Sequence, residues 1–165
     1  MRFKDRVALI TGGGRGIGAA TARLLAAEGA RVVVSDLDEG PAAEVATAIG
    51  GLGVACDVSN RAQVDSMVER TVKEMGGLDV LVTCAGIIRD NLLFKMTDED
   101  WDAVIDTHLK GTFLSARAAQ KKMVDQKYGK MVFLSSTSAL GNRGQANYSA
   151  AKAGLQGMAR TLAIE

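Results

Sequence analysis

The sequence has little of three residue types: it contains one proline and two cysteines, and aromatic residues occupy only 4% of its 165 positions. Cys56 and Cys84 form no CxxC pair, so we expect neither a disulfide framework nor a metal site. No stretch reaches the roughly 18 apolar residues that a membrane span needs, and the first residues lack the apolar core of a signal peptide. These absences predict a cytoplasmic protein in a reducing compartment, with no membrane partner.

An excess of one charge sign is also absent, because 20 Lys and Arg stand against 19 Asp and Glu, for a formal net charge of +1. A near-neutral chain is unsuited to nucleic-acid binding, which depends on the neutralisation of phosphates. Hydrophobic residues make up 47% of the chain and charged residues 24%, which is typical of a protein that buries a core. We therefore expect a single folded domain over residues 1–165.

Short apolar runs alternate with helical patterns along the chain, as in βαβ units. The runs are apolar at successive positions, which indicates strands of a parallel sheet that is covered on both faces. We expect a doubly wound α/β domain, a Rossmann fold, with the strand order 3-2-1-4-5. The five predicted strands span residues 7–11, 31–36, 53–58, 78–84 and 130–136.

Capping residues and apolar spacing predict the helices between these strands. The second helix begins at Pro41, Ser59 caps the third, and a long fourth helix follows Thr97. The fifth begins near Asn147, and its pattern runs to Glu165 without an end signal, so we expect a domain truncated after the fifth strand and its following helix. The predicted buried face of the fourth helix comprises Trp101, Val104, Ile105, Leu109 and Phe113.

A glycine-rich segment, TGGGRGIG at residues 11–18, joins the first predicted strand to the first predicted helix. Glycines allow a tight turn and a close approach to a pyrophosphate, and the helix N-terminus offers unpaired N–H groups to that anion. The strand before and the helix after distinguish the segment from an ordinary turn. The segment predicts a dinucleotide site that includes Gly12, Gly14, Arg15, Gly16, Ile17 and Gly18.

The choice of dinucleotide depends on Asp36, which ends the second predicted strand. A carboxylate there accepts hydrogen bonds from an adenosine ribose and repels a 2′-phosphate, which favours NAD. Arg15 supports the alternative, NADP, because a cation in the phosphate turn can pair with a 2′-phosphate. A glycine turn and an acid at these two strand ends also suit a methyltransferase, so a second site has to decide.

That second site is predicted by Tyr148 and Lys152, which are four positions apart and so share one helix face. A lysine ammonium beside the phenol and a helix N-terminus beneath it both favour the phenolate. The pair is then a usable general acid or base near neutral pH.

Several motifs, taken in order, resemble the short-chain dehydrogenase/reductase family. They are TGGGRGIG at 11–18, Asp57 with Val58, CAG at 84–86, SS at 135–136 and YSAAK at 148–152. The stretches GIIRDNLLFKM and GNRGQANYSAAKAG are similar to 3-oxoacyl-acyl-carrier-protein reductases, and QKYGKM, GQANYSAAK and LAIE are similar to 3-hydroxyacyl-CoA dehydrogenase domains. The resemblance implies NAD(P)-dependent hydride transfer at the 3-position of an acyl thioester, as in fatty acid metabolism.

The resemblance also implies a role for individual residues. Tyr148 is the acid in reduction and the base in oxidation, Lys152 supports it and holds the nicotinamide ribose, and Ser136 bonds the substrate oxygen. Ser135 is the alternative serine, because counting along the strand gives Ser136 whereas counting back from Tyr148 gives Ser135. The other implied cofactor contacts are Asp57, Val58, Cys84, Ala85 and Gly86.

Two positions depart from the family pattern. Thr83 and Cys84 replace two asparagines that are usual after the fourth strand, and His108 stands where a fourth catalytic residue, an asparagine, is usual. A neutral imidazole both donates and accepts, so His108 can relay protons between Lys152 and solvent, or it can be core packing.

Other functions stay open from the sequence. One is another secondary-alcohol dehydrogenase of the same family, and another is an inactive nucleotide-sensing or scaffold protein. The family also implies pairing of the fourth and fifth helices between subunits, and hence a homodimer or homotetramer.

Overall fold

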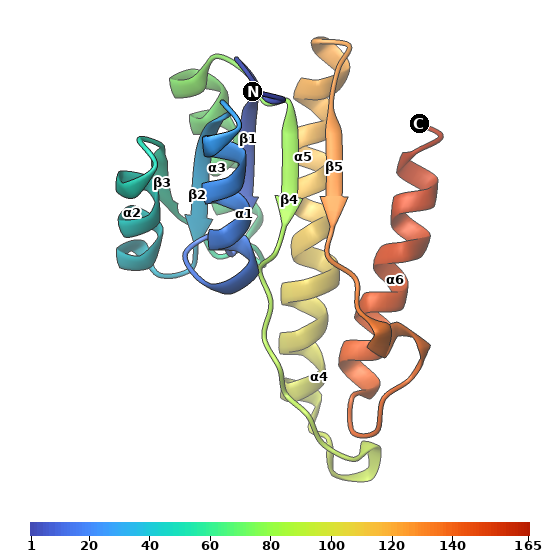
Figure 1. Ribbon diagram of the computed structural model, residues 1–165. Helices are drawn as coiled ribbons and strands as arrows, with labels where there is room; N and C mark the ends of the chain where they lie inside the picture. The colour runs from blue at the N-terminus through green and yellow to red at the C-terminus, as the bar shows by residue number, and fades with distance from the viewer.

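A computed structural model describes residues 1–165 as a parallel five-stranded sheet with helices on both faces (Figure 1). The strand order is β3-β2-β1-β4-β5, as predicted. The strands are β1 (Val7–Thr11), β2 (Arg31–Asp36), β3 (Leu52–Ala55), β4 (Val80–Thr83) and β5 (Lys130–Phe133). The helices are α1 (Gly16–Ala27), α2 (Glu39–Ala48), α3 (Arg61–Met75), α4 (Asp98–Ile105), α5 (Gly111–Asp125) and α6 (Ala146–Leu162), with short turns η1 (Leu93–Lys95), η2 (Asp106–Lys110) and η3 (Thr137–Leu140).

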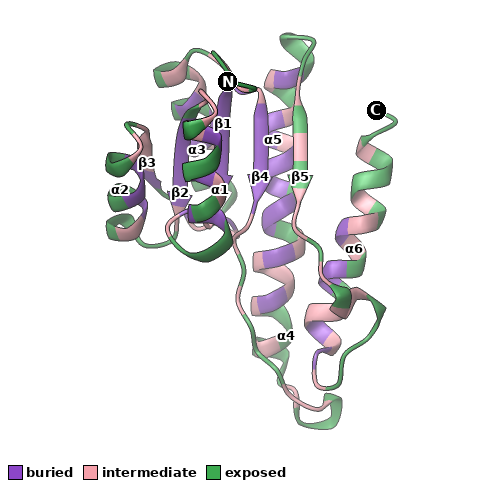
Figure 2. Ribbon diagram, in the orientation of Figure 1, coloured by how far each residue is buried: buried purple, intermediate pink, exposed green.

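Alternate residues of the strands build two separate cores. Leu9, Val33 and Leu81 point to one face of the sheet and pack with side chains of α3 and α5. Ile10 and Val34 point to the other face and pack with α1 and α2. The inner strands β1, β2 and β4 are almost wholly buried, whereas β5 is intermediate or exposed along its length (Figure 2).

The predicted bounds of β1 and β2 are confirmed to the residue, but β3, β4 and β5 are shorter than predicted. The chain leaves the sheet soon after the last residue of each of these strands. Cys84 and Leu134 still donate one backbone hydrogen bond each to the neighbouring strand, and the chain then turns away. The carboxyl ends of the strands therefore open into loops at one edge of the sheet.

Three predictions about helix ends are wrong. The helix α2 begins at Glu39 rather than at Pro41. Asn60, not Ser59, caps α3, and its side chain accepts a hydrogen bond from the backbone N–H of Gln63. Ser59 is unavailable because its hydroxyl donates to the carboxylate of Asp57, at 2.7 Å. The final helix stops at Leu162 rather than running to the last residue.

The long predicted fourth helix is continuous from Asp98 to Asp125, but η2 in its middle is a π-turn (Figure 1). A π-turn adds one residue to the helix and changes which side chains face inward after it. Val104 is buried as predicted, whereas Trp101 and Phe113 are 38% and 45% exposed. The predicted burial of these two aromatic residues is therefore wrong.

Candidate active site

The turn between β1 and α1 lies at the carboxyl edge of the sheet, against the loop that follows β4. A Cβ atom on Gly12 would lie 2.5 Å from the backbone nitrogen of Ala85, and one on Gly18 would lie 2.1 Å from the carbonyl oxygen of Gly12. Only glycine allows both approaches. The first turn of α1 holds no acidic residue, and its N-cap, Arg15, makes no side-chain cap bond. The backbone N–H groups in the first turn of α1 are thus free to bind an anion such as a pyrophosphate.

Asp36 reaches from the end of β2 into this turn. Its Oδ2 atom accepts a hydrogen bond from the backbone N–H of Gly14, at 2.9 Å. Arg15 lies beside it, but its guanidinium is 2.8 Å from Asp38 and 3.9 Å from Asp36. The side chain of Arg15 is therefore already engaged with two carboxylates, and the side chain of Asp36 is only 12% exposed.

A cavity of about 380 Å³ runs along this edge of the sheet. It brings together most of the residues predicted to bind a dinucleotide, and the glycines among them leave it open. From that prediction it contains Gly12, Arg15, Gly16, Asp36, Asp57, Val58, Cys84, Ala85 and Gly86. The predicted residues that do not line it are Gly14, Ile17, Gly18, Tyr148 and Lys152, although Gly14 binds Asp36 and Gly18 packs on Gly12. These residues fit a dinucleotide with its pyrophosphate at the N-terminus of α1.

Sequence reasoning missed five residues that line this cavity. They are Leu37, Asp38, Cys56, Ile87 and Thr107. Leu37 and Asp38 directly follow Asp36, so their position was a usable signal. Cys56 is buried, and this burial raises the pKa of its thiol to about 11.

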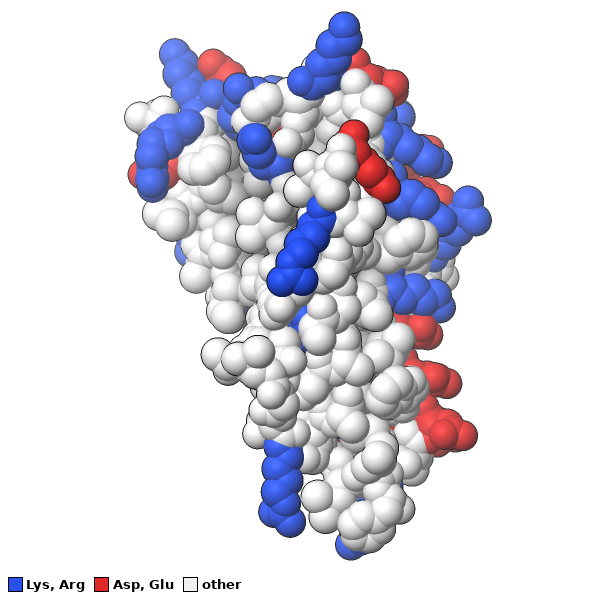
Figure 3. All heavy atoms as spheres, turned by 90° about the vertical axis from the view of Figure 1, so that its right-hand side faces the viewer, with Lys and Arg blue, Asp and Glu red and all other residues white.

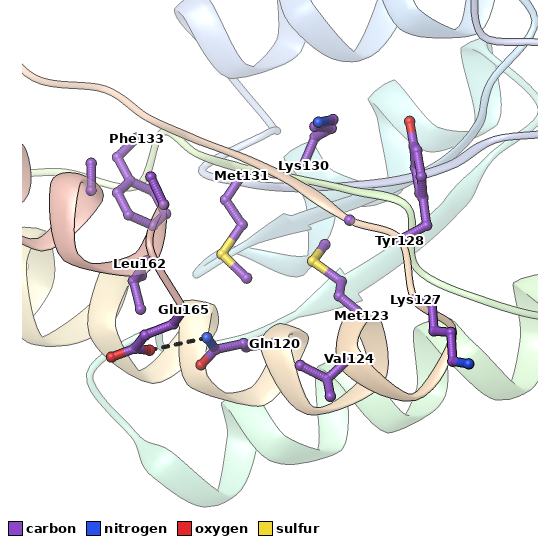
Figure 4. Close-up of a pocket in the computed structure, with 13 residues that line it drawn as sticks. Gln120, Met123, Val124, Lys127, Tyr128, Lys130, Met131, Phe133, Leu162 and Glu165 are labelled. Atoms are coloured by element: carbon purple, nitrogen blue, oxygen red, sulfur yellow. Dashed lines mark hydrogen bonds between the residues drawn. The ribbon is translucent and has the colours of Figure 1, made fainter.

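A larger cavity, about 630 Å³, lies elsewhere, between β5, α5 and α6 (Figure 4). Met123, Met131, Phe133 and Leu162 point into it, and Gln120 bonds Glu165 across one end at 3.2 Å. This cavity holds none of the predicted site residues. We therefore place the candidate active site at the smaller cavity, where the glycine turn and titratable groups meet.

Tyr148 and Lys152 lie on the first turns of α6, close to the same edge. The Nζ atom of Lys152 is 5.4 Å from the centroid of the Tyr148 ring. Lys152 is only 6% exposed, and its ammonium donates a hydrogen bond to the carbonyl oxygen of Leu134 at 2.6 Å. Burial lowers the pKa of Lys152.

The two serines after β5 make different bonds. The hydroxyl of Ser135 donates to the carbonyl oxygen of Lys152 at 2.9 Å and accepts from Gln156 at 3.1 Å. The hydroxyl oxygen of Ser136 accepts from the backbone N–H of Ser138 at 3.1 Å, and its hydrogen has no partner in the protein. Ser136 is therefore the serine with a free donor.

His108 lies between the cavity and Tyr148, within the π-turn. Its ring meets that of Tyr148 edge to face, with centroids 5.0 Å apart, and a Cβ atom on Gly86 would lie 2.3 Å from its Cε1 atom. Its Nε2 atom is 2.7 Å from the carbonyl oxygen and 3.0 Å from the backbone nitrogen of Ile87, while Nδ1 is buried without a partner. Burial lowers the pKa of His108, the hydrogen bond to the backbone of Ile87 opposes this shift, and the charge of Lys152 adds to it.

No helix of the chain is long and apolar enough to cross a membrane. In the view toward α6, charged side chains gather across the top and along one margin, while the middle of this face is mostly uncharged (Figure 3). Within α6 the charged residues are Lys152, which is buried, and Arg160.

Comparisons with known proteins agree with this geometry. A family model for short chain dehydrogenases matches residues 6–165. The chain is 46% identical to the short-chain reductase protein NovJ of Streptomyces niveus, over 98% of this chain and 64% of that protein. It is 41% identical to the 3-oxoacyl-[acyl-carrier-protein] reductase FabG of Escherichia coli, over 100% of this chain and 69% of FabG.

A third relative is BbsD of Thauera aromatica, a subunit of (2S)-[(R)-hydroxy(phenyl)methyl]succinyl-CoA dehydrogenase, which is 42% identical over 100% of this chain and 68% of BbsD. Among solved structures, the crystal structure of gox2181 matches with a TM-score of 0.95 and 37% identity, over 99% of this chain and 67% of that one. The chain thus spans between 64% and 69% of the length of these relatives.

Proposed function

Because the chain belongs to the short-chain dehydrogenase family, we propose that it is an oxidoreductase that transfers a hydride between a nicotinamide dinucleotide and a secondary alcohol or ketone. One observation carries the proposal. Tyr148, backed by the buried ammonium of Lys152, lies next to His108, which in turn contacts Gly86 at the wall of the dinucleotide cavity. A proton donor thus stands beside the cavity in which the nicotinamide would bind.

The glycine turn and the N-terminus of α1 would hold the pyrophosphate of a dinucleotide, and Asp57 with Val58 would hold its adenine end. When bound, the nicotinamide ring would supply or accept the hydride. In reduction, Tyr148 protonates the substrate oxygen, and in oxidation it removes that proton. Ser136 uses its free hydroxyl hydrogen to bond the same oxygen and to stabilise charge that develops on it.

Lys152 supports Tyr148 electrostatically. One of its three N–H donors is used by the carbonyl oxygen of Leu134, which leaves two for the nicotinamide ribose and the phenol. His108 supplies either a relay to solvent or packing. Nε2 is occupied by Ile87, which fits a packing role. Nδ1 is buried without a partner in the protein, and it is the nitrogen that a relay would use.

The preferred dinucleotide in this proposal is NAD, with NADP as the alternative. Asp36 places a carboxylate at the ribose end of the cavity, and Arg15 is held by two carboxylates rather than free to pair with a 2′-phosphate. The ratio of the affinities for NAD and NADP, measured by titration, tests this choice.

The proposed substrate is a 3-oxoacyl or 3-hydroxyacyl thioester. FabG is named as a reductase of 3-oxoacyl groups on acyl carrier protein, and BbsD as a subunit of a dehydrogenase of a CoA thioester. The carrier, CoA or acyl carrier protein, is therefore a choice between two thioesters of the same chemistry.

The experiment follows absorbance at 340 nm with an acetoacetyl thioester and each reduced dinucleotide, and it uses Tyr148→Phe as the control. We expect turnover in the wild-type chain and a loss of at least about 10²-fold in the variant, the low end of acid–base effects. Dinucleotide binding without turnover would instead support the nucleotide-sensing or scaffold alternative. Equal turnover in both proteins would remove Tyr148 from the mechanism.

We also propose that a second copy of the chain covers the outer face of the helix formed by α4 and α5. Trp101 and Phe113 are partly exposed on it, although large aromatic side chains usually lie in a core. A homodimer or homotetramer would bury them, and analytical ultracentrifugation tests this.

The two free cysteines are consistent with a reducing compartment such as the cytoplasm.

A further inference from the structure

Asn147 directly precedes Tyr148 and is fully buried, although it carries a polar amide. Its Nδ2 atom donates hydrogen bonds to the carbonyl oxygens of Arg89 at 3.0 Å and Asp100 at 3.1 Å. Its Oδ1 atom accepts a hydrogen bond from the backbone N–H of Tyr148 at 2.8 Å. Both donor hydrogens of the amide and one acceptor position are therefore in use.

These three bonds join parts of the chain that are distant in sequence. Arg89 lies in the loop after β4, Asp100 lies in the first turn of α4, and Tyr148 lies in the first turn of α6. The separations along the chain are 58 positions to Arg89 and 47 to Asp100. One side chain thus fixes the start of α6 against two other elements at once.

The bond to Tyr148 also fills a gap in the capping of α6. The first N–H groups of a helix have no partner within the helix, and a side chain at the N-cap usually binds one of them. In α6 the N-cap residue, Gln145, makes no such bond. Its amide is turned instead to the carboxylate of Asp90, at 2.8 Å. Asn147 therefore satisfies the N–H of the very residue proposed to move the proton.

We infer that Asn147 is a positioning residue for Tyr148, which it fixes relative to the loop after β4 and to α4. The inference rests on the proposed function, because that function gives Tyr148 the proton transfer. Asn147 acts through backbone groups and needs no contact with substrate or dinucleotide. An error of about 1 Å in the place of a reacting group can cost roughly 10²-fold in rate, so the position of this first turn has a direct catalytic effect.

The test compares Asn147→Ala and Asn147→Asp with a matched control, Gln126→Ala. Gln126 also donates its amide to two backbone carbonyls, those of Leu78 at 2.6 Å and Tyr128 at 2.8 Å, at the opposite edge of the sheet. We expect kcat to fall by about 10- to 100-fold in both Asn147 variants, with KM changed less than about threefold, because the substrate site itself is intact. Gln126→Ala should lower the thermal midpoint but keep the wild-type kcat.

The aspartate variant separates the bonds of the amide from each other. It keeps the acceptor for the N–H of Tyr148 and loses both donors, so a wild-type kcat in Asn147→Asp would overturn the proposed link to Arg89 and Asp100. A wild-type kcat in Asn147→Ala would overturn the whole inference. An equal loss of kcat in Gln126→Ala would do the same, since it would show that general destabilisation is sufficient.

Hydrogen exchange gives a readout that does not depend on turnover. We expect faster exchange in residues 86–92 and 146–152 of Asn147→Ala, and unchanged exchange there in Gln126→Ala. If the wild-type chain reduces no thioester, the proposed function fails, and hydrogen exchange alone then decides the inference about Asn147. Faster exchange in both segments would sustain the positioning role, and unchanged exchange in either would overturn it.

Discussion

The contact between Gly86 and His108 makes a sharp prediction about the substitution Gly86→Ala. A Cβ atom at this position would lie 2.3 Å from Cε1 of His108 and 3.0 Å from each ring nitrogen. The ring is 4% exposed and is held by the backbone of Ile87 and by the ring of Tyr148. It therefore cannot turn away without breaking one of these contacts.

The expected cost follows from these contacts. Overpacking of a buried site costs about 1 to 3 kcal/mol, and the loss of one hydrogen bond costs about 0.5 to 1.5 kcal/mol more. We expect Gly86→Ala to lower the free energy of unfolding by roughly 2 to 4 kcal/mol. For a chain of this size the midpoint of thermal unfolding should fall by roughly 4 to 16 °C, which circular dichroism can measure.

Two further variants check the reasoning. Gly157 lies in the interior of α6 with open space around its Cα, so Gly157→Ala should raise stability by about 0.5 to 1 kcal/mol. In a His108→Ala background the cost of Gly86→Ala should largely disappear, because the ring that the new methyl group meets is gone. A wild-type midpoint for Gly86→Ala, or an undiminished cost in the His108→Ala background, would refute the argument.

Three other outcomes follow from single contacts. Asp36→Asn removes the charge but keeps the acceptor for the N–H of Gly14. A unit charge about 4 Å from a 2′-phosphate is worth about 1 to 4 kcal/mol. Titration should therefore show that the ratio of NAD affinity to NADP affinity falls about tenfold or more. An unchanged ratio would mean that Asp36 does not face the ribose. Thr97→Ala removes the cap bond to the N–H of Asp100, at 3.1 Å, and should cost about 1 kcal/mol in urea unfolding, where an unaltered midpoint would count against the cap. Burial lowers the pKa of His108 in the folded state, so the stability that the neutral ring contributes is present above about pH 6.5 and is lost as the pH falls toward that lower pKa. Between pH 8 and 5.5 the free energy of unfolding should therefore fall less in His108→Asn than in the wild type. Parallel pH curves for the two proteins would contradict this.

The sequence was sufficient for the elements whose signals are local. β1 and β2 contain the apolar runs VALI and VVV, and the turn from Gly12 to Gly18 is defined by neighbouring residues. The wrong predictions involve competition between groups. Ser59 has the right chemistry for a cap, but Asp57 takes its hydroxyl.

The site shows the same limit. Asp36 was predicted because it ends a strand, and Asp57 and Gly86 because they match a family pattern after a strand, whereas Thr107 lies within a helix and enters the cavity only through tertiary packing. Asn147 stood inside a quoted motif, yet its importance depends on carbonyl groups far away in the sequence. Backbone carbonyls carry no residue-specific signal, so no pattern in the sequence could indicate them.

The π-turn at Asp106–Lys110 makes the number of residues in this helix matter as much as their identity. Each residue turns an α-helix by about 100°, so the extra residue rotates α5 relative to α4 and lets one helix pack against α6 at one end and against α3 and β4 at the other. A substitution on its surface changes one side chain, whereas the deletion of a single codon would rotate every residue after it. The register of the helix, which this extra residue sets, thus matters for the contact between the rings of His108 and Tyr148.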